Sequence, residues 1–364
     1  MAESIKVELG ERSYEILIIE GMEGFGLALQ KRLRPSLVLL VADETVAGLY
    51  APSALSSLSE AGIKAALVPF PPGEASKSLS RASLLYDAFF RLRADRKSVV
   101  AALGGGVTGD LAGFAAATFM RGIPYVQVPT TVLAQVDSSV GDKTGVNHPA
   151  GKNMIGCFHQ PSLVYTDLAT LRTLPEEEFA CGMAEVVKHG VIRDATYFEY
   201  IETHLDAIRA MDMACLREAI GGSCRIKAGV VAADERESGL RAILNFGHTV
   251  GHALEALTDF TGYRHGEAVS IGMMAACRLA EALLGFPASE SARIAGLLKR
   301  IGLPTSLTGL KAEAVLDALV TDKKAEYGTL RFVLPRRIGE VCILPVKDKG
   351  VVRAAIQAVS FRSA

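Results

Sequence analysis

The first half of the chain alternates between short apolar runs and helical stretches, and this alternation restricts the fold more than any other feature. Residues 36–43 are almost continuously apolar until a final acid, which is typical of a strand buried on both faces. Residues 63–70 and 98–103 have the same character, and stretches with helical spacing of apolar residues separate these runs. Strands that alternate with helices predict βαβ units and a mostly parallel sheet, with ligands at the carboxyl ends of the strands.

The pattern changes at Pro175, and from there it is helical until two short strand-like segments at residues 330–334 and 340–344. We therefore predict two domains. An α/β N-terminal nucleotide-binding domain with a mostly parallel sheet covers residues 1–173, and a mainly α-helical C-terminal domain covers residues 174–364.

Composition excludes several classes of function. The 364 residues carry 39 Lys and Arg against 40 Asp and Glu, which leaves no excess of positive charge for nucleic acid or an anionic membrane. The N-terminal segment has no apolar core of a signal peptide, and no apolar run is long enough to span a bilayer. The six cysteines include no CxxC pair, so we expect reduced thiols. These features predict a cytoplasmic protein with neither a nucleic-acid nor a membrane partner.

The strongest local motif is GGGVTGD at residues 104–110, which follows the apolar run 98–103 and opens a helix. Glycines at such a turn let the backbone approach a pyrophosphate, and the helix N-terminus supplies free N–H groups. We expect Asp110 to be the N-cap. The order is not that of an ordinary dinucleotide-binding dehydrogenase, because the glycines follow a later strand and the acid suited to a ribose, Asp43, precedes them. A purely structural glycine turn remains the alternative.

Three further polar segments have both a functional and a structural interpretation. Residues 73–77 (GEASK) and 129–131 (PTT) follow strands, where they contact a phosphate or ribose or merely form a turn and a helix cap. Residues 137–153 form a polar segment rich in Gly, Asp, Lys and Asn, which suits an anionic ligand or a solvated loop.

The second half contains candidate metal ligands. His248 and His252 lie at i and i+4 on the helix predicted for residues 244–259, His265 opens the next helix, and Glu185 lies in an otherwise apolar helical stretch. Zinc binds histidine nitrogen and carboxylate oxygen. The spacing nominates His248 and His252 first, with His265 or Glu185 as a third ligand, and a structural histidine pair is the alternative.

Several motifs together resemble the 3-dehydroquinate synthase family. They are GGGVTGDLAGFAAATFMRG, VPTTVLAQVDSSVGDKTGVN, GKNMIGCFHQP, MAEVVKHG, GLRAILNFGHTVGHALEA and HGEAVSIGM, and they occur in order between about Asp43 and the sequence DKK at residues 322–324. The resemblance implies an NAD-binding α/β domain followed by a helical metal-binding domain, normally in a homodimer. It implies that 3-deoxy-D-arabino-heptulosonate 7-phosphate becomes 3-dehydroquinate and phosphate, by transient NAD-dependent oxidation, β-elimination, re-reduction and aldol closure.

The resemblance also implies roles for individual residues. The metal ligands, for Zn²⁺ or Co²⁺, are Glu185, His248 and His265, so His252 contacts substrate instead. The residues implied in catalysis are Asp137, Lys188, Asn245 and His252. Those implied in substrate binding are Lys143, Asn153, Lys227, Arg241, a lysine of the DKK motif (Lys323 or Lys324), and Arg121 from the neighbouring subunit. Those implied in NAD⁺ binding are Asp43, Glu74, Lys77, Gly105, Gly106, Val107, Asp110, Thr130, Thr131, Lys143, Lys152, Thr170 and Thr173.

The chain departs from the family pattern at Pro72, where an acid is common, and Asp43 aligns only loosely. Three other functions compete with this interpretation. A related cyclase that makes a valiolone or an inosose is disfavoured by Asn153 and His252, since those positions tend to differ when the substrate lacks the carboxylate. A metal-dependent polyol dehydrogenase would accumulate NADH. A catalytically silent nucleotide-binding module does not explain the joint pattern of acid, histidines and cationic residues.

Overall fold

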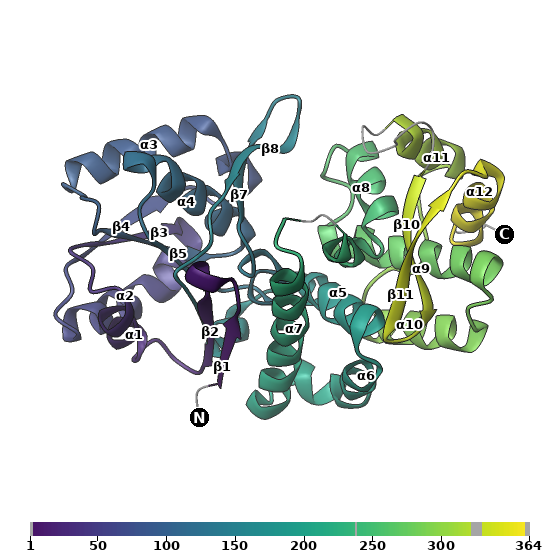
Figure 1. The fold of residues 1–364 in the computed structure, drawn as a ribbon, viewed down its shortest axis with the longest axis horizontal. Helices are drawn as coiled ribbons and strands as arrows, with labels where there is room; N and C mark the ends of the chain where they lie inside the picture. The colour runs from purple at the N-terminus through teal and green to yellow at the C-terminus, as the bar shows by residue number, and fades with distance from the viewer. Residues whose placement is uncertain (1–2, 237–238, 322–329, 361–364) are drawn as a thin grey trace. The chain divides into compact units, whose positions relative to one another are not determined.

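The computed structural model describes residues 3–236, 239–321 and 330–360 (Figure 1). Its contacts divide the chain into two compact units, Met1–Pro175 with Leu216–Ala232, and Glu176–Cys215 with Ala233–Ala364. The segment Leu216–Ala232 groups with the first unit, although the sequence assigned it to the second domain. The boundary after residue 173 stays a prediction.

The first unit contains a seven-stranded sheet in the order β1-β2-β9-β6-β5-β3-β4. Only the pair β1 and β2 is antiparallel within this sheet, so the prediction of a mostly parallel sheet is confirmed. The strands are β1 (Glu3–Val7), β2 (Tyr14–Ile19), β3 (Val38–Asp43), β4 (Ala65–Phe70), β5 (Val99–Gly104), β6 (Tyr125–Pro129) and β9 (Leu163–Asp167).

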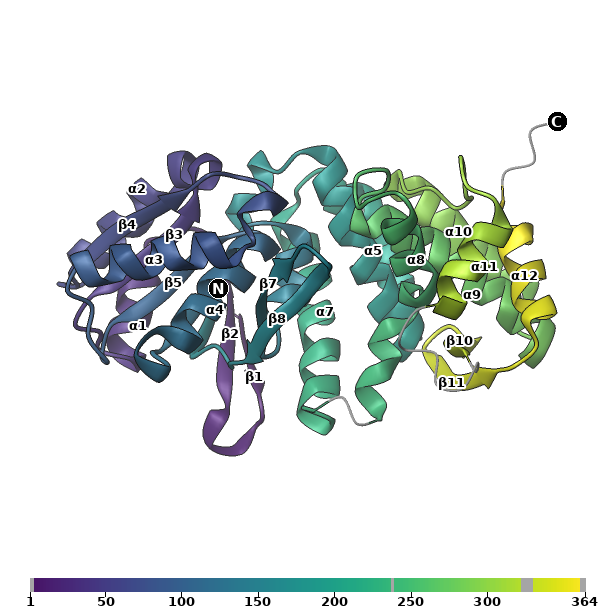
Figure 2. The ribbon, with the colours of Figure 1, turned by 90° about the horizontal axis from the view of Figure 1, so that it is seen from above.

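Helices cover both faces of this sheet (Figures 1 and 2). Along β3, Leu39 and Val41 pack with the core under α3 and α4, whereas Val38 and Leu40 pack with the core under α1 and α2. Both sets are buried, which explains why β3 has no alternation of polar and apolar residues. The helices of this unit are α1 (Phe25–Arg32), α2 (Glu44–Glu60), α3 (Leu79–Arg91), α4 (Gly106–Thr118) and most of α7 (Met213–Ala233).

Two hairpins of the first unit were not predicted. The strands β1 and β2 pair at the edge of the large sheet. Residues 137–153 were interpreted as a polar loop. They instead contain the last two residues of a π-helical turn (Ala134–Ser138) and most of a hairpin, which is formed by β7 (Lys143–His148) and β8 (Gly151–Phe158). The sequence did not predict this hairpin because its residues are polar and show no apolar alternation. β7 is buried through its contacts with α4, and such contacts cannot be inferred from a local sequence pattern.

The second unit is mainly helical, and α9 lies at its centre, packed against α5, α8, α10, α12 and β10 (Figure 2). The prediction of a helical part with a terminal pair of strands is confirmed. No helix in the described part of the chain is both long and apolar enough for a membrane span. The elements are α5 (Glu176–Arg193), α6 (Ala195–Arg209), α8 (His248–Leu257), α9 (His265–Leu284), α10 (Ala288–Ile301), α11 (Ala312–Thr321), β10 (Leu330–Arg337), β11 (Glu340–Val346) and α12 (Lys349–Ala358).

Glycines allow α9 to approach its neighbours closely. A Cβ at Gly272 would lie 1.9 Å from the carbonyl oxygen of Gly247, which directly precedes α8. A Cβ at Gly266 would lie 2.1 Å from the carbonyl oxygen of Cys181 on α5, and the Gly266 N–H donates to the Cys181 Sγ at 3.0 Å. The backbones of α5, α8 and α9 are therefore held together without side chains between them at these two points.

We expect Gly272→Ala to lower the free energy of unfolding by about 1–3 kcal/mol, because the added methyl group overlaps a backbone oxygen that cannot move independently. Gly296→Ala is the matched control in the exposed middle of α10, where a Cβ meets no atom within 4 Å. There the change should raise stability by about 0.5–1 kcal/mol through helix propensity. Urea unfolding followed by circular dichroism measures both, and equal effects of the two changes would contradict this account.

Candidate active site

The predicted cofactor residues of the first unit gather at the carboxyl edge of the parallel strands. Asp43 ends β3 and caps α2, accepting from the backbone N–H groups of Thr45 and Val46 at 3.0 Å each. β4 lies on one side of β3, and β5, the next strand along the chain, lies on the other side. The order of the strands therefore reverses between β3 and β5, which is the topological switch point of the sheet. Lys143 and Lys152 lie instead in β7 and β8. The other predicted residues follow the ends of β4, β5, β6 and β9, and they are Glu74, Lys77, Gly105, Gly106, Val107, Asp110, Thr130, Thr131, Thr170 and Thr173.

The glycine motif forms the N-terminus of α4, but the helix begins at Gly106 with Gly105 as N-cap. The prediction that Asp110 caps this helix is therefore wrong. The glycines allow β5 to end at Gly104 and α4 to begin at Gly106, so Asp110 lies in the second turn of the helix. Within the described residues no side chain caps the helix. Its first N–H groups are thus available to an anion, and Gly105 leaves room beside the Thr131 side chain, 3.2 Å from where a Cβ would be.

A buried lysine links the glycine helix to the β7–β8 hairpin. The Lys77 Nζ lies 2.5 Å from the Asp110 carboxylate and donates a hydrogen bond to the side-chain oxygen of Asn153. The Asn147 side chain donates to the Glu74 carboxylate at 2.7 Å, so a second contact ties the hairpin to the same turn. Burial raises the pKa of Asp110 above its ordinary value, against the lowering effect of the Lys77 charge. Residues from three separate predicted motifs are thereby brought together.

The buried Gln135 and the half-buried Tyr50 organise the loops after β6 and β9. The Gln135 amide donates to the carbonyl oxygens of Pro129 and Asp167 at 3.2 and 3.1 Å and to the Thr170 hydroxyl at 3.3 Å. The Tyr50 hydroxyl donates to the carbonyl oxygen of Thr170 at 2.9 Å and shares a hydrogen bond with the Thr173 hydroxyl. Gln135 and Tyr50 were not among the predicted residues, and nothing in their sequence context signalled these contacts.

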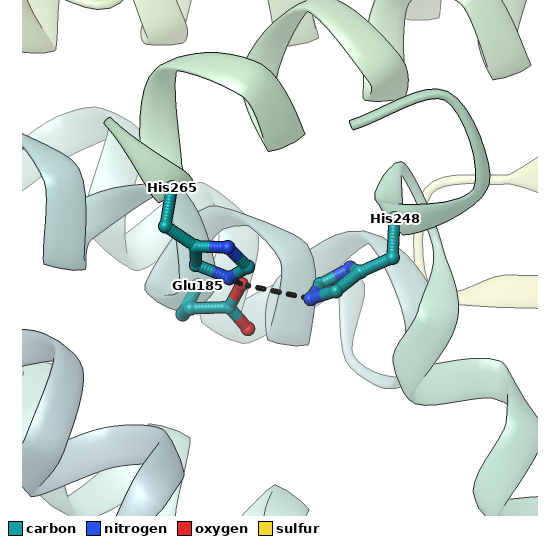
Figure 3. Close-up of side chains that lie close together, drawn as sticks. All are labelled: Glu185, His248 and His265. Atoms are coloured by element: carbon teal, nitrogen blue, oxygen red, sulfur yellow. Dashed lines mark ion pairs between the residues drawn. The ribbon is translucent and has the colours of Figure 1, made fainter. Parts of the chain in front are cut away.

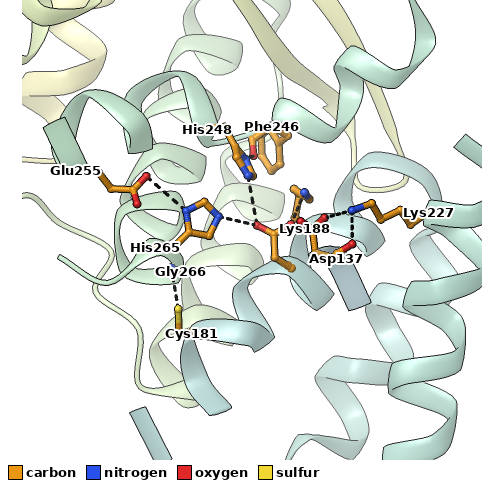
Figure 4. Close-up of polar contacts among 10 residues, drawn as sticks. Asp137, Cys181, Lys188, Lys227, Phe246, His248, Glu255, His265 and Gly266 are labelled. Atoms are coloured by element: carbon orange, nitrogen blue, oxygen red, sulfur yellow. Dashed lines mark hydrogen bonds and ion pairs between the residues drawn. The ribbon is translucent and has the colours of Figure 1, made fainter. Parts of the chain in front are cut away.

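Asp137 and Lys227 form a second pair within the first unit. Asp137 lies in the π-helical turn, and the Lys227 Nζ on α7 lies 2.5 Å from its carboxylate and 2.6 Å from its carbonyl oxygen (Figure 4). Lys227 is buried. π-helical turns occur frequently at functional sites, because the extra residue redirects a side chain. Lys143 is exposed, and Lys152 is half-buried.

In the second unit, Glu185, His248 and His265 come together from three helices (Figure 3). One potential ligand atom from each lies within 4.8 Å of the other two. The Nε2 atoms of His248 and His265 lie 3.5 and 3.7 Å from the Glu185 Oε1. Glu185 is fully buried on α5, and neither of its oxygens has a well-aligned hydrogen bond among the described residues; its charge partner is Lys188, one turn along the same helix. The structure thus brings together the ligand set that the family resemblance implied.

Outer contacts fix how the two imidazoles point. The Nδ1 of His248 lies 3.1 Å from the carbonyl oxygen of Phe246, which can only accept, so this nitrogen carries the proton and Nε2 is left to accept. The Nδ1 of His265 lies 3.4 Å from the Oε2 of Glu255 (Figure 4). Glu255 was not among the predicted residues, although it lies seven residues after His248 and so on the same face of the helix.

Electrostatics give the two histidines opposite protonation in the metal-free protein. Burial, with the charge of Lys188, lowers the pKa of His248 to about 3. Burial alone would lower the pKa of His265, but the nearby carboxylates of Glu185 and Glu255 outweigh it and raise this pKa to about 10. Burial by itself raises the pKa of Glu185, yet the charge of Lys188 and the neighbouring histidines hold it well below its usual range. An ionised carboxylate thus persists in the interior because cationic groups surround it.

The remaining residues predicted for the second unit lie near the start of α8. The predicted helix over residues 244–259 is wrong in its first part, because the left-handed Gly247 (φ 81°) separates a 3₁₀ turn, Leu240–Asn245, from α8. Arg241 and Asn245 lie in that turn, and Arg241 is buried. The His252 ring is exposed and lies 5.3 Å from the His248 ring.

Two predicted substrate contacts are not among the residues described above. Lys323 and Lys324 lie outside the described residues. Arg121 is exposed on the first unit, in a turn where Met120, Arg121 and Gly122 all have positive φ.

Family models match most of the chain. The 3-dehydroquinate synthase N-terminal model covers residues 67–181, and the C-terminal model covers residues 182–325. The chain is 51% identical to the 3-dehydroquinate synthase of Desulforamulus reducens, over 98% of this chain and 99% of that protein, and 51% identical to that of Symbiobacterium thermophilum, over 97% and 99%. The chain belongs to the 3-dehydroquinate synthase family.

Solved structures with the same fold include two synthases with NAD⁺ and a metal ion bound. A 2-deoxy-scyllo-inosose synthase complexed with carbaglucose-6-phosphate, NAD⁺ and Co²⁺ has a TM-score of 0.88 and 26% identity, covering 98% of this chain and all of its own. The 2-epi-5-epi-valiolone synthase of Streptomyces hygroscopicus, with NAD⁺ and Zn²⁺ bound, has a TM-score of 0.87 and 27% identity, covering 97% and 98%. A probable glycerol dehydrogenase from Sinorhizobium meliloti shares the fold alone, with a TM-score of 0.66 and 15% identity over 94% and 96%.

We expect Lys188→Met to lower the free energy of unfolding of the chelator-treated protein by about 3–5 kcal/mol, because it removes a buried cation and leaves Glu185 buried beside fewer positive charges. Lys299→Met removes an exposed lysine from α10 and should change stability by less than about 0.5 kcal/mol. Denaturant unfolding measures both. A near-neutral Lys188→Met would show that Glu185 is not held ionised by its neighbour.

Proposed function

We propose that this protein is an NAD⁺- and metal-dependent enzyme that converts 3-deoxy-D-arabino-heptulosonate 7-phosphate to 3-dehydroquinate and inorganic phosphate. The observation that carries the proposal is the convergence of one buried carboxylate and two oriented imidazoles from α5, α8 and α9, in a chain half identical to curated 3-dehydroquinate synthases. The reaction oxidises a hydroxyl transiently, eliminates phosphate, reduces the ketone again and closes the ring by an aldol step.

The side chains present fit both cofactors. A divalent cation suits Glu185, His248 and His265, because the Glu185 oxygens are buried without well-aligned hydrogen bonds and both Nε2 atoms face them. Zn²⁺ and Co²⁺ both suit such a set of nitrogen and oxygen donors. NAD⁺ suits the uncapped N-terminus of α4, where glycine leaves the backbone open to a pyrophosphate. When bound, the metal acts as a Lewis acid toward the carbinol, and NAD⁺ accepts and returns the hydride.

In the second unit, the chain's own groups bind and orient the substrate. Lys188 keeps a positive charge beside Glu185 and offers a proton to a substrate hydroxyl. Arg241 is the partner for the planar substrate carboxylate, because a guanidinium can form two parallel hydrogen bonds with it. Asn245 and His252 contact the substrate hydroxyls, and His252 is exposed for this role.

In the first unit, Asp137 receives or returns the proton of a reacting hydroxyl. The Lys227 Nζ lies 2.5 Å from that carboxylate and pairs with it in the absence of substrate. Lys143 and Asn153, with Lys323 or Lys324, surround the phosphate. The cofactor contacts are Asp43, Glu74, Lys77, Gly105, Gly106, Val107, Asp110, Thr130, Thr131, Lys143, Lys152, Thr170 and Thr173, and their support is that most of them follow the carboxyl ends of parallel strands.

Purified protein given heptulosonate phosphate, NAD⁺ and Zn²⁺ should release phosphate in a 1:1 ratio to 3-dehydroquinate, with no net rise in absorbance from NADH. Prior treatment with a chelator should reduce the rate by at least about 10²-fold, because oxidation of the carbinol loses its Lewis acid. Phosphate release that survives chelation, or steady accumulation of NADH, would contradict the proposal. Turnover of sugar phosphates without a carboxylate in preference to heptulosonate phosphate would favour a valiolone- or inosose-type cyclase.

The proposal extends to assembly and location. The enzyme acts as a homodimer in which each subunit lends Arg121 to the phosphate pocket of its partner. The support is the exposure of Arg121 in a turn where two successive non-glycine residues, Met120 and Arg121, have positive φ, a costly backbone geometry that is typical of functional positions. The enzyme resides in the cytoplasm, in keeping with its six free cysteines.

Donation across the interface predicts complementation between two inactive variants. Arg121→Ala and His248→Ala should each be inactive alone. After unfolding and refolding of an equal mixture, about a quarter of wild-type activity should return, because half of the dimers contain one complete site out of two. An arginine that acts within its own subunit would return none, so an inactive mixture containing heterodimers would contradict the proposal.

A further inference from the structure

We propose that Glu255 is a positioning residue for the metal centre, which orients His265 and fixes its tautomer. This inference rests on the proposed function, because it concerns the metal that Glu185, His248 and His265 are proposed to hold. It goes beyond it by assigning a role to a residue outside the ligand set.

The first argument is that His265 has a carboxylate at each ring nitrogen. Its Nε2 lies 3.7 Å from the Glu185 Oε1, and its Nδ1 lies 3.4 Å from the Glu255 Oε2 (Figure 4). An imidazole that binds a metal through Nε2 must keep its remaining proton on Nδ1. A carboxylate at Nδ1 accepts that proton in a hydrogen bond, selects this tautomer and raises the basicity of Nε2.

The second argument is the contrast with His248. The Nδ1 of His248 is held by a main-chain carbonyl, that of Phe246, which lies two residues before the start of α8. His265 opens α9 directly after a segment, residues 258–264, without regular structure. Its ring therefore depends on a side chain for its second hydrogen bond, and Glu255 at the end of α8 supplies it.

The third argument is the burial of Glu255. The side chain is 11% exposed, against 70% and 49% for Glu177 and Glu178, which form ion pairs at the surface. Removing a carboxylate from water costs free energy unless a charged or polar group offsets the loss. The Nδ1–H of His265, 3.4 Å from the Glu255 Oε2, offers such a group. Glu255 also lies seven residues after His248, so one face of α8 carries both a proposed ligand and the group that orients the other.

The test measures metal affinity directly, without turnover. Competition between the protein and a coloured chelator gives the dissociation constants for Zn²⁺ and Co²⁺, and the visible spectrum of bound Co²⁺ reports ligand geometry. We expect Glu255→Ala to weaken binding by about 10–100-fold and to change the Co²⁺ bands. Glu255→Gln keeps a hydrogen-bond acceptor but removes the charge, so it should weaken metal binding less than Glu255→Ala does. Glu281→Ala, which removes a carboxylate paired with Arg278 on the same unit, is the matched control and should bind as the wild type does.

Wild-type affinity and an unchanged Co²⁺ spectrum in Glu255→Ala would overturn the inference. So would an affinity loss in Glu255→Ala that is matched by a similar loss in Glu281→Ala, since this would indicate general destabilisation. If Glu255→Ala fails to fold, Glu255→Gln decides: unchanged affinity together with an unchanged spectrum rejects the inference. His248→Ala separates this result from the proposed function, because metal binding that survives in His248→Ala contradicts the metal site itself.

Discussion

The second unit depends on a single ionised carboxylate, that of Glu185, held in an interior without access to water. An isolated charge there is unstable, so the helices around it must supply cationic groups or hydrogen-bond donors. Lys188 lies on the same helix and His265 comes from α9, whereas His248 on α8 faces the carboxylate with an Nε2 that is free to bind a metal. The close approach of these helices at Gly266 and Gly272 is therefore part of the site, because it brings side chains from separate segments within reach of one carboxylate.

In the first unit, the proposed cofactor contacts come largely from the backbone, whereas the proposed metal ligands of the second unit are side chains. Its cofactor residues follow the carboxyl ends of parallel strands, and the glycine turn leaves the N–H groups of α4 available. Side chains then hold these loops in place. Gln135 joins the segments after β6 and β9, and Lys77 joins the glycine helix to the β7–β8 hairpin. A long polar segment thereby becomes an ordered element beside the proposed phosphate contacts.

Much of the architecture could be predicted from local patterns. Strand β3 and its parallel neighbours are recognisable as short apolar runs, and α9 as a long helix, because burial on both faces or all round leaves a simple signature. The β7–β8 hairpin and the first turn of α4 were missed or misplaced. In both elements, polar or glycine residues adopt regular structure because of contacts with residues far away in the sequence. A local sequence pattern contains no information about those contacts.

The sequence by itself determined the βαβ order, the helical second half and, through motifs in a fixed order, the family and the set of candidate metal ligands. Only the tertiary structure decided which imidazole nitrogens face Glu185, that Asp110 pairs with Lys77 rather than capping its helix, and that Glu255 lies against His265. The physical reason is the distance between partners along the chain. Periodicity and motif spacing express interactions within one helix or strand, whereas a hydrogen bond between two helices depends on how their backbones pack.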